Sequence, residues 1–453
     1  MLKRKTYQKL LDWKQESKGS SALLIEGARR VGKSTLVEEF AKNEYETFLI
    51  IDFTIAPDDV IGYFNDMRND LDSFFMYLSA YYRIELQRRK TLIVFDEVQA
   101  FPKARESIKM LVADGRFDYI ETGSLMSIRK SVEGILIPSE ERAIHLHPFD
   151  FDEFLWAMGE AALAAYIAEA FTAMKPLPAS LHRKAMRLFR EYMLVGGMPQ
   201  AVQKYAETRN FESVDTIKRD IMALYRNDIA KHAGSATRRV TSIFDNVAGQ
   251  LAKHEKRFIL ALLGKNARMR DYEDAFFWLS DAYITNDCYN STDPGVGLRI
   301  SMDNSAVKCY MADTGLLVTH ALATLEHTAD EIYRDILLEK IGINEGMFTE
   351  NIVAQQLRTH GHELFFYSRR DRNDANSNME VDFLIVSQYA NAALRSRVSP
   401  IEVKSTKRFG VSSLDKFKAR FGKQVGTQYV ICPRELSFDG DRVILPLYMA
   451  GCL

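Results

Sequence analysis

The sequence predicts a multidomain α/β protein whose N-terminal part is a doubly wound parallel sheet. The chain has 453 residues, more than one hydrophobic core usually organises, so we expect about two to four domains. Short apolar runs alternate with amphipathic helical patterns over the first third of the chain, which is typical of a parallel sheet covered by helices. The predicted strands are residues 22–26, 47–52, 91–96, 117–122 and 142–147.

The composition is that of a globular protein without a strong charge bias. Apolar residues make up 47%, charged residues 27%, and the formal net charge is -1. These values exclude a disordered or broadly basic chain, so any contact with nucleic acid must be local. The four cysteines lack the paired spacing of a zinc site or disulfide framework, which favours reduced thiols and a cytoplasmic location. We expect no membrane association, because no apolar run approaches the ~20 residues of a membrane span.

The first predicted strand leads into a phosphate-binding loop. Residues 27–34, GARRVGKS, fit the pattern G-x-x-x-x-G-K-[ST] between a strand and a helix, which is the context the motif requires. The glycines let backbone N–H groups point at phosphate oxygens, and the helix presents its positive end to the same anion. Lys33 would neutralise charge on the β- and γ-phosphates, and Ser34 would ligate Mg²⁺. The predicted nucleotide-binding residues are Gly27, Val31, Gly32, Lys33, Ser34 and Thr35.

Two acids follow the third predicted strand, in the stretch TLIVFDEVQ. Asp96 would orient Mg²⁺ through its water shell, and Glu97 is placed to polarise the attacking water. The alternative is a solvated strand end. With the phosphate loop upstream, the two acids predict an enzyme that binds ATP with Mg²⁺ and hydrolyses it.

The next strand ends in Thr122, Gly123 and Ser124. This pattern resembles the AAA-type ATPases, in which a sensor residue at this strand tip contacts the γ-phosphate. The resemblance makes Ser124 the catalytic sensor, with Thr122 as the alternative. A capped turn between a strand and a helix would also explain the Thr-Gly-Ser sequence.

A series of short motifs runs in a specific order along nearly the whole chain. They are GARRVGKST, FDEVQ, TGS, HPFDFDEF, GGMP, YMADTGLL and a C-terminal EVD followed by IEVK. Their order resembles a prokaryotic AAA-type P-loop ATPase family whose members carry a C-terminal domain of unknown function related to the PD-(D/E)xK nucleases. We therefore expect four segments: an AAA-type ATPase core (1–150), a helical lid (151–230), a winged-helix-like domain (231–330) and a nuclease-like α/β domain (331–453).

The predicted lid contains a Gly-Gly pair before Pro199, which suits the first turn of a helix. We interpret these glycines as a structural turn. In AAA-type assemblies a neighbouring subunit often supplies an arginine to the γ-phosphate, so a homo-oligomer or a protein partner is compatible with the resemblance. The sequence leaves Arg142, Arg219 and Arg226 as equally open choices, and each also fits a solvated helix charge.

The stretch from Lys231 to Arg270 has nine lysines and arginines against two acids. Short helical patterns precede AYITNDCYNSTDPGVGLRI, which predicts a strand, a Gly/Pro turn and a second strand, as in a winged helix. Such a module could bind duplex DNA through phosphate contacts with little sequence selectivity. The alternative is a lid or spacer with a solvated basic face.

Charged residues on three C-terminal elements are predicted to face one pocket. Glu350 lies on the apolar face of a predicted helix. Alternation in MEVDFLIV places Glu380 and Asp382 on one face of a strand, and PIEVKS places Glu402 and Lys404 together on the next. Such burial requires a metal, a paired cation or water.

This arrangement resembles the PD-(D/E)xK nuclease core. By that resemblance Asp382 and Glu402 are metal ligands and Glu350 assists them. Lys404 then positions or activates the water that attacks phosphorus. The alternative is a buried ion-pair cluster in a degenerate nuclease fold that mediates contacts.

Three functions are compatible with these patterns. The first is an Mg²⁺-dependent ATPase that acts on or near DNA and carries a nuclease-like domain. The second is a regulatory protein in which ATP switches the binding of a partner. The third is a loader or initiator-like ATPase that binds DNA through a winged helix.

Overall fold

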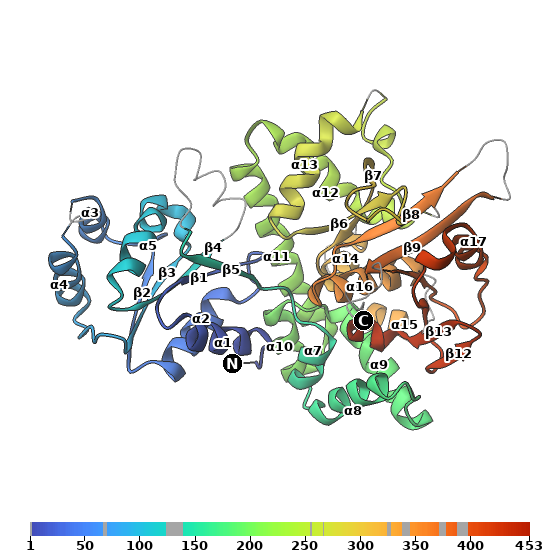
Figure 1. Cartoon of the computed structure of the whole chain (residues 1–453), viewed down its shortest axis with the longest axis horizontal. Coiled ribbons are helices and arrows are strands. Elements are labelled where there is room, and N and C mark those ends of the chain that lie inside the picture. Colours follow the sequence, from blue (N-terminus) through green and yellow to red (C-terminus); the bar gives the residue numbers. More distant parts are fainter. Residues whose placement is uncertain are drawn as a thin grey trace. The chain divides into compact units, whose positions relative to one another are not determined.

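A computed structural model describes residues 2–66, 70–123, 139–253, 256–265, 267–323, 328–337, 345–370, 377–386 and 397–453. The chain folds into two compact units, Met1–His147 and Pro148–Leu453, whose elements are labelled in Figure 1. No described helix in either unit is both long and apolar enough to cross a membrane.

A five-stranded parallel sheet forms the centre of the first unit, with the strand order β2-β3-β4-β1-β5. The strands are β1 (Ala22–Glu26), β2 (Thr47–Asp52), β3 (Thr91–Asp96), β4 (Asp118–Gly123) and β5 (Glu141–His145). Each lies within two residues of its predicted position. Strands β1, β3 and β4 are buried along their whole length, as expected for apolar runs in a parallel sheet. The predicted α/β class with a parallel core is confirmed.

One helix precedes the first strand of this sheet, and the others lie between successive strands in the chain. They are α1 (Thr6–Ser17), α2 (Lys33–Glu44), α3 (Asp58–Asp66), α4 (Leu71–Tyr82) and α5 (Pro102–Asp114). An aromatic core joins α3 and α4 to the sheet: the ring of Phe64 lies 4.9 Å from that of Phe74 and 5.5 Å from that of Phe95. Edge-to-face contacts of this kind hold the apolar side of the sheet away from water.

A carboxyl group is fully buried in the same sheet, at Glu121 on β4. Arg105 on α5 donates to the neighbouring Glu141 carboxylate at 3.0 and 2.7 Å, while neither oxygen of Glu121 has a hydrogen-bond partner among the described residues. Burial, and then the nearby Glu141 carboxyl group, raise the pKa of Glu121 well above its usual range. The folded protein therefore favours the protonated, neutral form of Glu121.

Glu121→Gln is expected to raise the melting temperature at pH 8 more than at pH 5. The folded protein holds a proton that the unfolded chain, with a carboxyl pKa of about 4.3, releases. The stability contributed by this group is therefore lost as pH rises from about 4 toward the raised pKa. Thermal melts at both pH values test this, with the exposed Glu46→Gln as the control. An equal difference at both pH values would show that Glu121 does not titrate on folding.

The second unit begins with the helices expected after residue 150. They are α7 (Phe151–Ala157), α8 (Ala161–Thr172), α9 (Ala179–Val195), α10 (Pro199–Thr208) and α11 (Phe211–His232). The HPFDFDEF motif has a local structural role, because Asp150 and Glu153 form a capping box at the start of α7. Such a box satisfies backbone N–H groups that a helix start leaves unpaired.

An eight-stranded mixed sheet forms the rest of this unit, in the order β12-β13-β11-β10-β9-β8-β6-β7. The strands are β6 (Thr285–Ser291), β7 (Met302–Met311), β8 (Phe365–Arg369), β9 (Met379–Val386), β10 (Val398–Val403), β11 (Gln428–Cys432), β12 (Ser437–Asp439) and β13 (Arg442–Pro446). The remaining α-helices are α12 (Thr237–Leu251), α13 (Met269–Asp281), α14 (Thr314–Ala321), α15 (Asp330–Leu337), α16 (Glu345–Thr359) and α17 (Ser412–Phe421).

The order of elements from α12 to β7 is helix, helix, strand, strand, and Figure 1 shows the two helices beside the β6–β7 hairpin. The second strand begins at Met302, later than the predicted stretch, because residues 292–301 form a turn closed by Thr292 and Ser301. Strand β6 also pairs in parallel with β8. Strands from both sides of the predicted domain boundary, between residues 330 and 331, therefore belong to one sheet. The winged-helix assignment stays a prediction.

The GGMP and ADTG motifs interlock at the core of the second unit. Asp313 accepts hydrogen bonds from Gly197 N at 2.5 Å and Leu316 N at 2.9 Å. Gly196 has a φ of 83°, and a Cβ there would lie 2.2 Å from the Asp313 carboxylate. A Cβ at Gly315 would lie 2.3 Å from the main chain at the end of α9. Both motifs thus require glycine for close packing.

Candidate nucleotide site and the C-terminal charge cluster

The phosphate loop lies between β1 and α2, and α2 begins at Lys33 directly after Gly32. Gly32 has a φ of 94°, which glycine adopts without steric cost. The Lys33 ammonium is buried and donates to Gly27 O at 2.9 Å and Ala28 O at 3.2 Å. Burial lowers the pKa of Lys33. The lysine is thus held within the loop that the motif assigns to phosphate.

Three polar side chains meet beside this loop. Ser34 Oγ donates to Asp96 Oδ1 at 2.9 Å, and the hydroxyl of Thr122 donates to the same oxygen. Strand β4 lies between β3 and β1, so the ends of parallel strands bring Asp96 and Thr122 to the loop. Burial raises the pKa of Asp96, although these two hydrogen bonds favour its ionised form. The structure therefore brings together the two residues predicted to hold Mg²⁺.

Glu97 adopts a left-handed backbone conformation with a φ of 52°. A positive φ is uncommon outside glycine and is concentrated at functional sites. The Glu97 N–H donates to Thr122 Oγ1 at 3.2 Å, while its carboxylate accepts from Gln99 Nε2. The carboxylates of Asp96 and Glu97 thus have different hydrogen-bond donors, Ser34 and Thr122 for Asp96 and Gln99 for Glu97.

The residues present fit a nucleotide with Mg²⁺. A serine hydroxyl and a carboxylate 2.9 Å apart are oxygen ligands of the kind that Mg²⁺ takes together with phosphates and water. Of the other predicted nucleotide-binding residues, Val31 is buried and its N–H donates to Ala28 O at 3.3 Å, while Thr35 is exposed. Ser124 lies outside the described residues, whereas its alternative Thr122 contacts Asp96.

Each of the three open arginines has an acidic partner within its own unit. Arg142 pairs with Glu16 at 2.9 Å in the first unit. In the second unit the pairs are Arg219 with Asp215 at 2.6 Å and Arg226 with Asp245 at 2.9 Å. None of these pairs identifies an arginine that reaches a neighbouring subunit's nucleotide.

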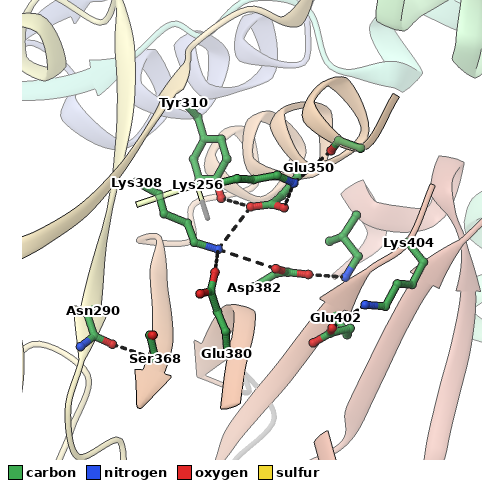
Figure 2. Close-up of polar contacts among 12 residues, drawn as sticks. Lys256, Asn290, Lys308, Tyr310, Glu350, Ser368, Glu380, Asp382, Glu402 and Lys404 are labelled. Atoms are coloured by element: carbon green, nitrogen blue, oxygen red, sulfur yellow. Dashed lines mark hydrogen bonds and ion pairs between the residues drawn. The ribbon is translucent and has the colours of Figure 1, made fainter. Parts of the chain in front are cut away.

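A lysine occupies the centre of the predicted C-terminal site (Figure 2). Lys308 on β7 is fully buried. Its Nζ lies 2.8 Å from Glu380 Oε1, 3.3 Å from Glu350 Oε1 and 3.7 Å from Asp382 Oδ1. Although burial alone would lower it, these carboxylates hold the pKa of Lys308 well above its usual range. Lys308 is therefore charged.

Glu350 on α16 has three partners in this cluster. Lys256 and the hydroxyl of Tyr310 donate to its two oxygens, and Lys308 approaches from β7. Burial alone would raise the pKa of Glu350, but the ammonium groups of Lys308 and Lys256 lower it to about 2. Its carboxylate is therefore ionised and saturated by protein donors.

Of the other residues predicted for this site, Lys404 and Glu402 form a separate ion pair. Lys404 Nζ lies 2.6 Å from Glu402 Oε1, and Asp382 Oδ2 accepts from Val403 N at 2.8 Å. The other Glu402 oxygen is buried and has no hydrogen-bond partner among the described residues. Burial, and then the Asp382 carboxylate, raise the pKa of Glu402 to about 8.

We refer to these groups as the lysine–carboxylate cluster: Lys256, Lys308, Lys404, Glu350, Glu380, Asp382 and Glu402. The cluster does not fit the predicted divalent metal, because ammonium groups already pair with its carboxylates. As the side chains stand, no group of three or more His, Cys, Asp or Glu residues in the described part of the chain is arranged to hold a metal ion. The metal roles expected of Glu350, Asp382 and Glu402, and the water-activating role of Lys404, thus lack a supporting geometry.

The residues predicted for this site did not include Lys308, Tyr310 or Lys256. A lysine within the apolar run AVKCYM was an available signal, because an isolated charge in a buried strand requires partners. Lys256 carried no such signal. It belongs to the basic stretch predicted to bind DNA, yet it is bound to Glu350.

Three segments of the chain match family models. Residues 19–155 match an AAA domain, residues 186–328 match a domain of unknown function (DUF8612), and residues 345–450 match another (DUF4143). The sheet and phosphate loop of the first unit are thus those of an AAA P-loop ATPase domain, as the sequence predicted. The other two descriptions name no activity, so the relation to nucleases stays a prediction.

Among solved structures, AMPPCP-bound DnaA from Aquifex aeolicus is 11% identical to this chain and has a TM-score of 0.26. The match covers 77% of this chain and 95% of that one. At this score the similarity supports no conclusion about function. Comparison with curated proteins finds no match.

Proposed function

We propose that this protein is an Mg²⁺-dependent ATPase whose nucleotide cycle changes what its second unit binds. The observation that carries the first half of this proposal is the convergence of Ser34, Asp96 and Thr122 beside the phosphate loop. The second half is supported by the lysine–carboxylate cluster, since paired carboxylates favour a binding module over metal-dependent cleavage.

In this proposal each residue of the nucleotide site has a distinct role in phosphoryl transfer. Lys33 turns from the loop carbonyls to the β- and γ-phosphates and neutralises their charge. Ser34 and Asp96 hold Mg²⁺, which when bound offsets charge on the phosphate oxygens. Glu97 polarises the water that attacks the γ-phosphate, and Thr122 keeps Asp96 oriented.

A metal-dependence assay tests this function. Phosphate release from ATP should require Mg²⁺, stop when EDTA is added in excess and resume when Mg²⁺ is restored. The reason is that the charge on the transferred phosphoryl group must be neutralised in the transition state. Release that is indifferent to EDTA would exclude the proposed chemistry.

Duplex DNA is a second candidate partner, supported by exposed cations in the stretch from Lys231 to Arg270. They are Lys231, Arg238, Arg257, Lys265, Arg268 and Arg270. Lys256 does not belong to this set, because it pairs with Glu350. A solvated basic face remains the alternative.

Reversing Arg238, Arg257, Arg268 and Arg270 to glutamate is expected to weaken duplex binding and flatten its dependence on salt. The slope of log K against log salt should become shallower by about 0.9 for every DNA phosphate that the protein no longer neutralises. Fluorescence anisotropy at several salt concentrations measures this. A matched control reverses the exposed Lys175, Arg183, Arg187 and Arg420, with the same change in net charge. Equal effects in both variants would mean that only net charge matters.

A further inference from the structure

Two described elements of the second unit place carboxylates around one ammonium group, which comes from a third element. Glu350 comes from α16, Glu380 and Asp382 come from β9, and Lys308 comes from β7. Figure 2 shows the Lys308 side chain reaching from its strand to all three carboxylates. Lys308 is fully buried, so these contacts replace its hydration.

Oxygen ligands from two elements around a single positive centre are what a divalent cation also requires. Here the positive centre is the ammonium group of Lys308. An ammonium carries one charge and donates in fixed directions, whereas Mg²⁺ or Mn²⁺ would carry two charges and draw the same oxygens closer. The Lys308 ammonium and a divalent cation would therefore compete for the same position between the carboxylates.

We propose that Lys308 is a built-in cation that closes a latent divalent-cation site formed by Glu350, Glu380 and Asp382. Lys308 fills the position between the carboxylates, and Lys256 and Tyr310 complete the pairing of Glu350. The protein is therefore metal-free at this position, and the cluster joins β7 to α16 and β9. This inference is independent of ATP hydrolysis by the first unit.

The charge balance of the lysine–carboxylate cluster supports this arrangement. It contains three ammonium groups and four carboxyl groups. Each ammonium group lies within ion-pair distance of a carboxylate of the cluster. A divalent ion added to the intact cluster would therefore bring further positive charge beside carboxylates that are already paired.

The cluster also connects two segments that match different family models. Lys308 and Lys256 lie in residues 186–328, whereas Glu350, Glu380 and Asp382 lie in residues 345–450. The pairing of β6 with β8 joins the same two segments in one sheet. Lys308 therefore acts as an electrostatic link between them, a task that a bound metal would otherwise perform.

Mn²⁺ titration of the full-length, nucleotide-free protein tests the proposal, with binding followed by electron paramagnetic resonance. Wild type and Asp382→Ala should bind equally little Mn²⁺ at this position. Lys308→Met, which keeps an unbranched side chain but removes the ammonium group, should gain a single Mn²⁺ per chain. The matched control Lys308→Met/Asp382→Ala should lose that gain, because a carboxylate ligand is removed.

Thermal melts give a second readout. Lys308→Met should melt below wild type without metal and recover when Mn²⁺ is added, because a ligand that binds only the folded state stabilises it. The double variant should not recover. Mn²⁺ binding by wild type that Asp382→Ala abolishes would overturn the proposal, and so would a folded Lys308→Met that takes up no Mn²⁺. If Lys308→Met does not fold, Mn²⁺ binding by wild type that is lost in Asp382→Ala would still overturn the proposal.

Discussion

Glu97→Gln is expected to retain ATP and to lose turnover, by ~10²- to 10⁴-fold if Glu97 is the general base. Lys33→Ala is expected to lose tight ATP binding itself. The difference follows from the two roles: Lys33 neutralises phosphate charge in the bound state, whereas Glu97 acts on water only during the reaction. Glutamine has the same length as glutamate, so we expect the variant to keep the left-handed backbone of Glu97, which has a φ of 52°.

Two measurements separate these outcomes. Equilibrium binding of a fluorescent ATP analogue reports the ground state, and phosphate release under saturating ATP reports turnover. Glu38→Gln on the exposed face of α2 is a matched control, because it removes a carboxylate that pairs only with Lys42. Turnover by Glu97→Gln at the wild-type rate would remove Glu97 from the mechanism.

Asp313→Ala is expected to destabilise the second unit by about 3 kcal/mol or more, because two buried N–H groups each lose their acceptor. Those groups belong to Gly197 and Leu316. Asp313→Asn should cost less, since its amide oxygen can still accept. The close approach of Gly196 leaves no room for a larger side chain to compensate.

Urea denaturation of the same three proteins measures the loss. Asp303→Ala is the control, since Asp303 accepts from Ser305 N at 2.9 Å in an exposed hydrogen bond near the start of β7, and we expect it to cost less than about 1 kcal/mol. A loss for Asp313→Ala no larger than that of the control would mean that the two motifs do not depend on this carboxylate.

The sequence was sufficient for the parallel sheet and for the phosphate loop because both depend on local patterns. Strands β1, β2 and β3 each contain four consecutive apolar residues. The motif around Lys33 fixes its own loop and the start of α2. The meeting of Ser34 with Asp96 follows once the strands are parallel, since their carboxyl ends share one edge of the sheet.

The C-terminal cluster could be predicted only in part. Alternation along β9 and β10 correctly indicated charged side chains turned inward, with Asp382 partly buried and Glu402 buried. Alternation does not identify the partner across the sheet. Lys308 comes from a strand of the preceding segment, and Lys256 is 94 residues from Glu350 in sequence. Long-range ion pairs of this kind leave no periodic pattern in a single sequence.

The most direct test of the proposed ATPase is steady-state phosphate release by wild type and Lys33→Ala, purified in parallel and assayed with saturating ATP and Mg²⁺. The same preparations should be assayed with and without duplex DNA, because a DNA partner could be the trigger for turnover. We predict release by wild type that Lys33→Ala reduces to background under the same conditions. Equal rates for the two proteins, with and without DNA, would contradict the assignment of ATP hydrolysis to this phosphate loop.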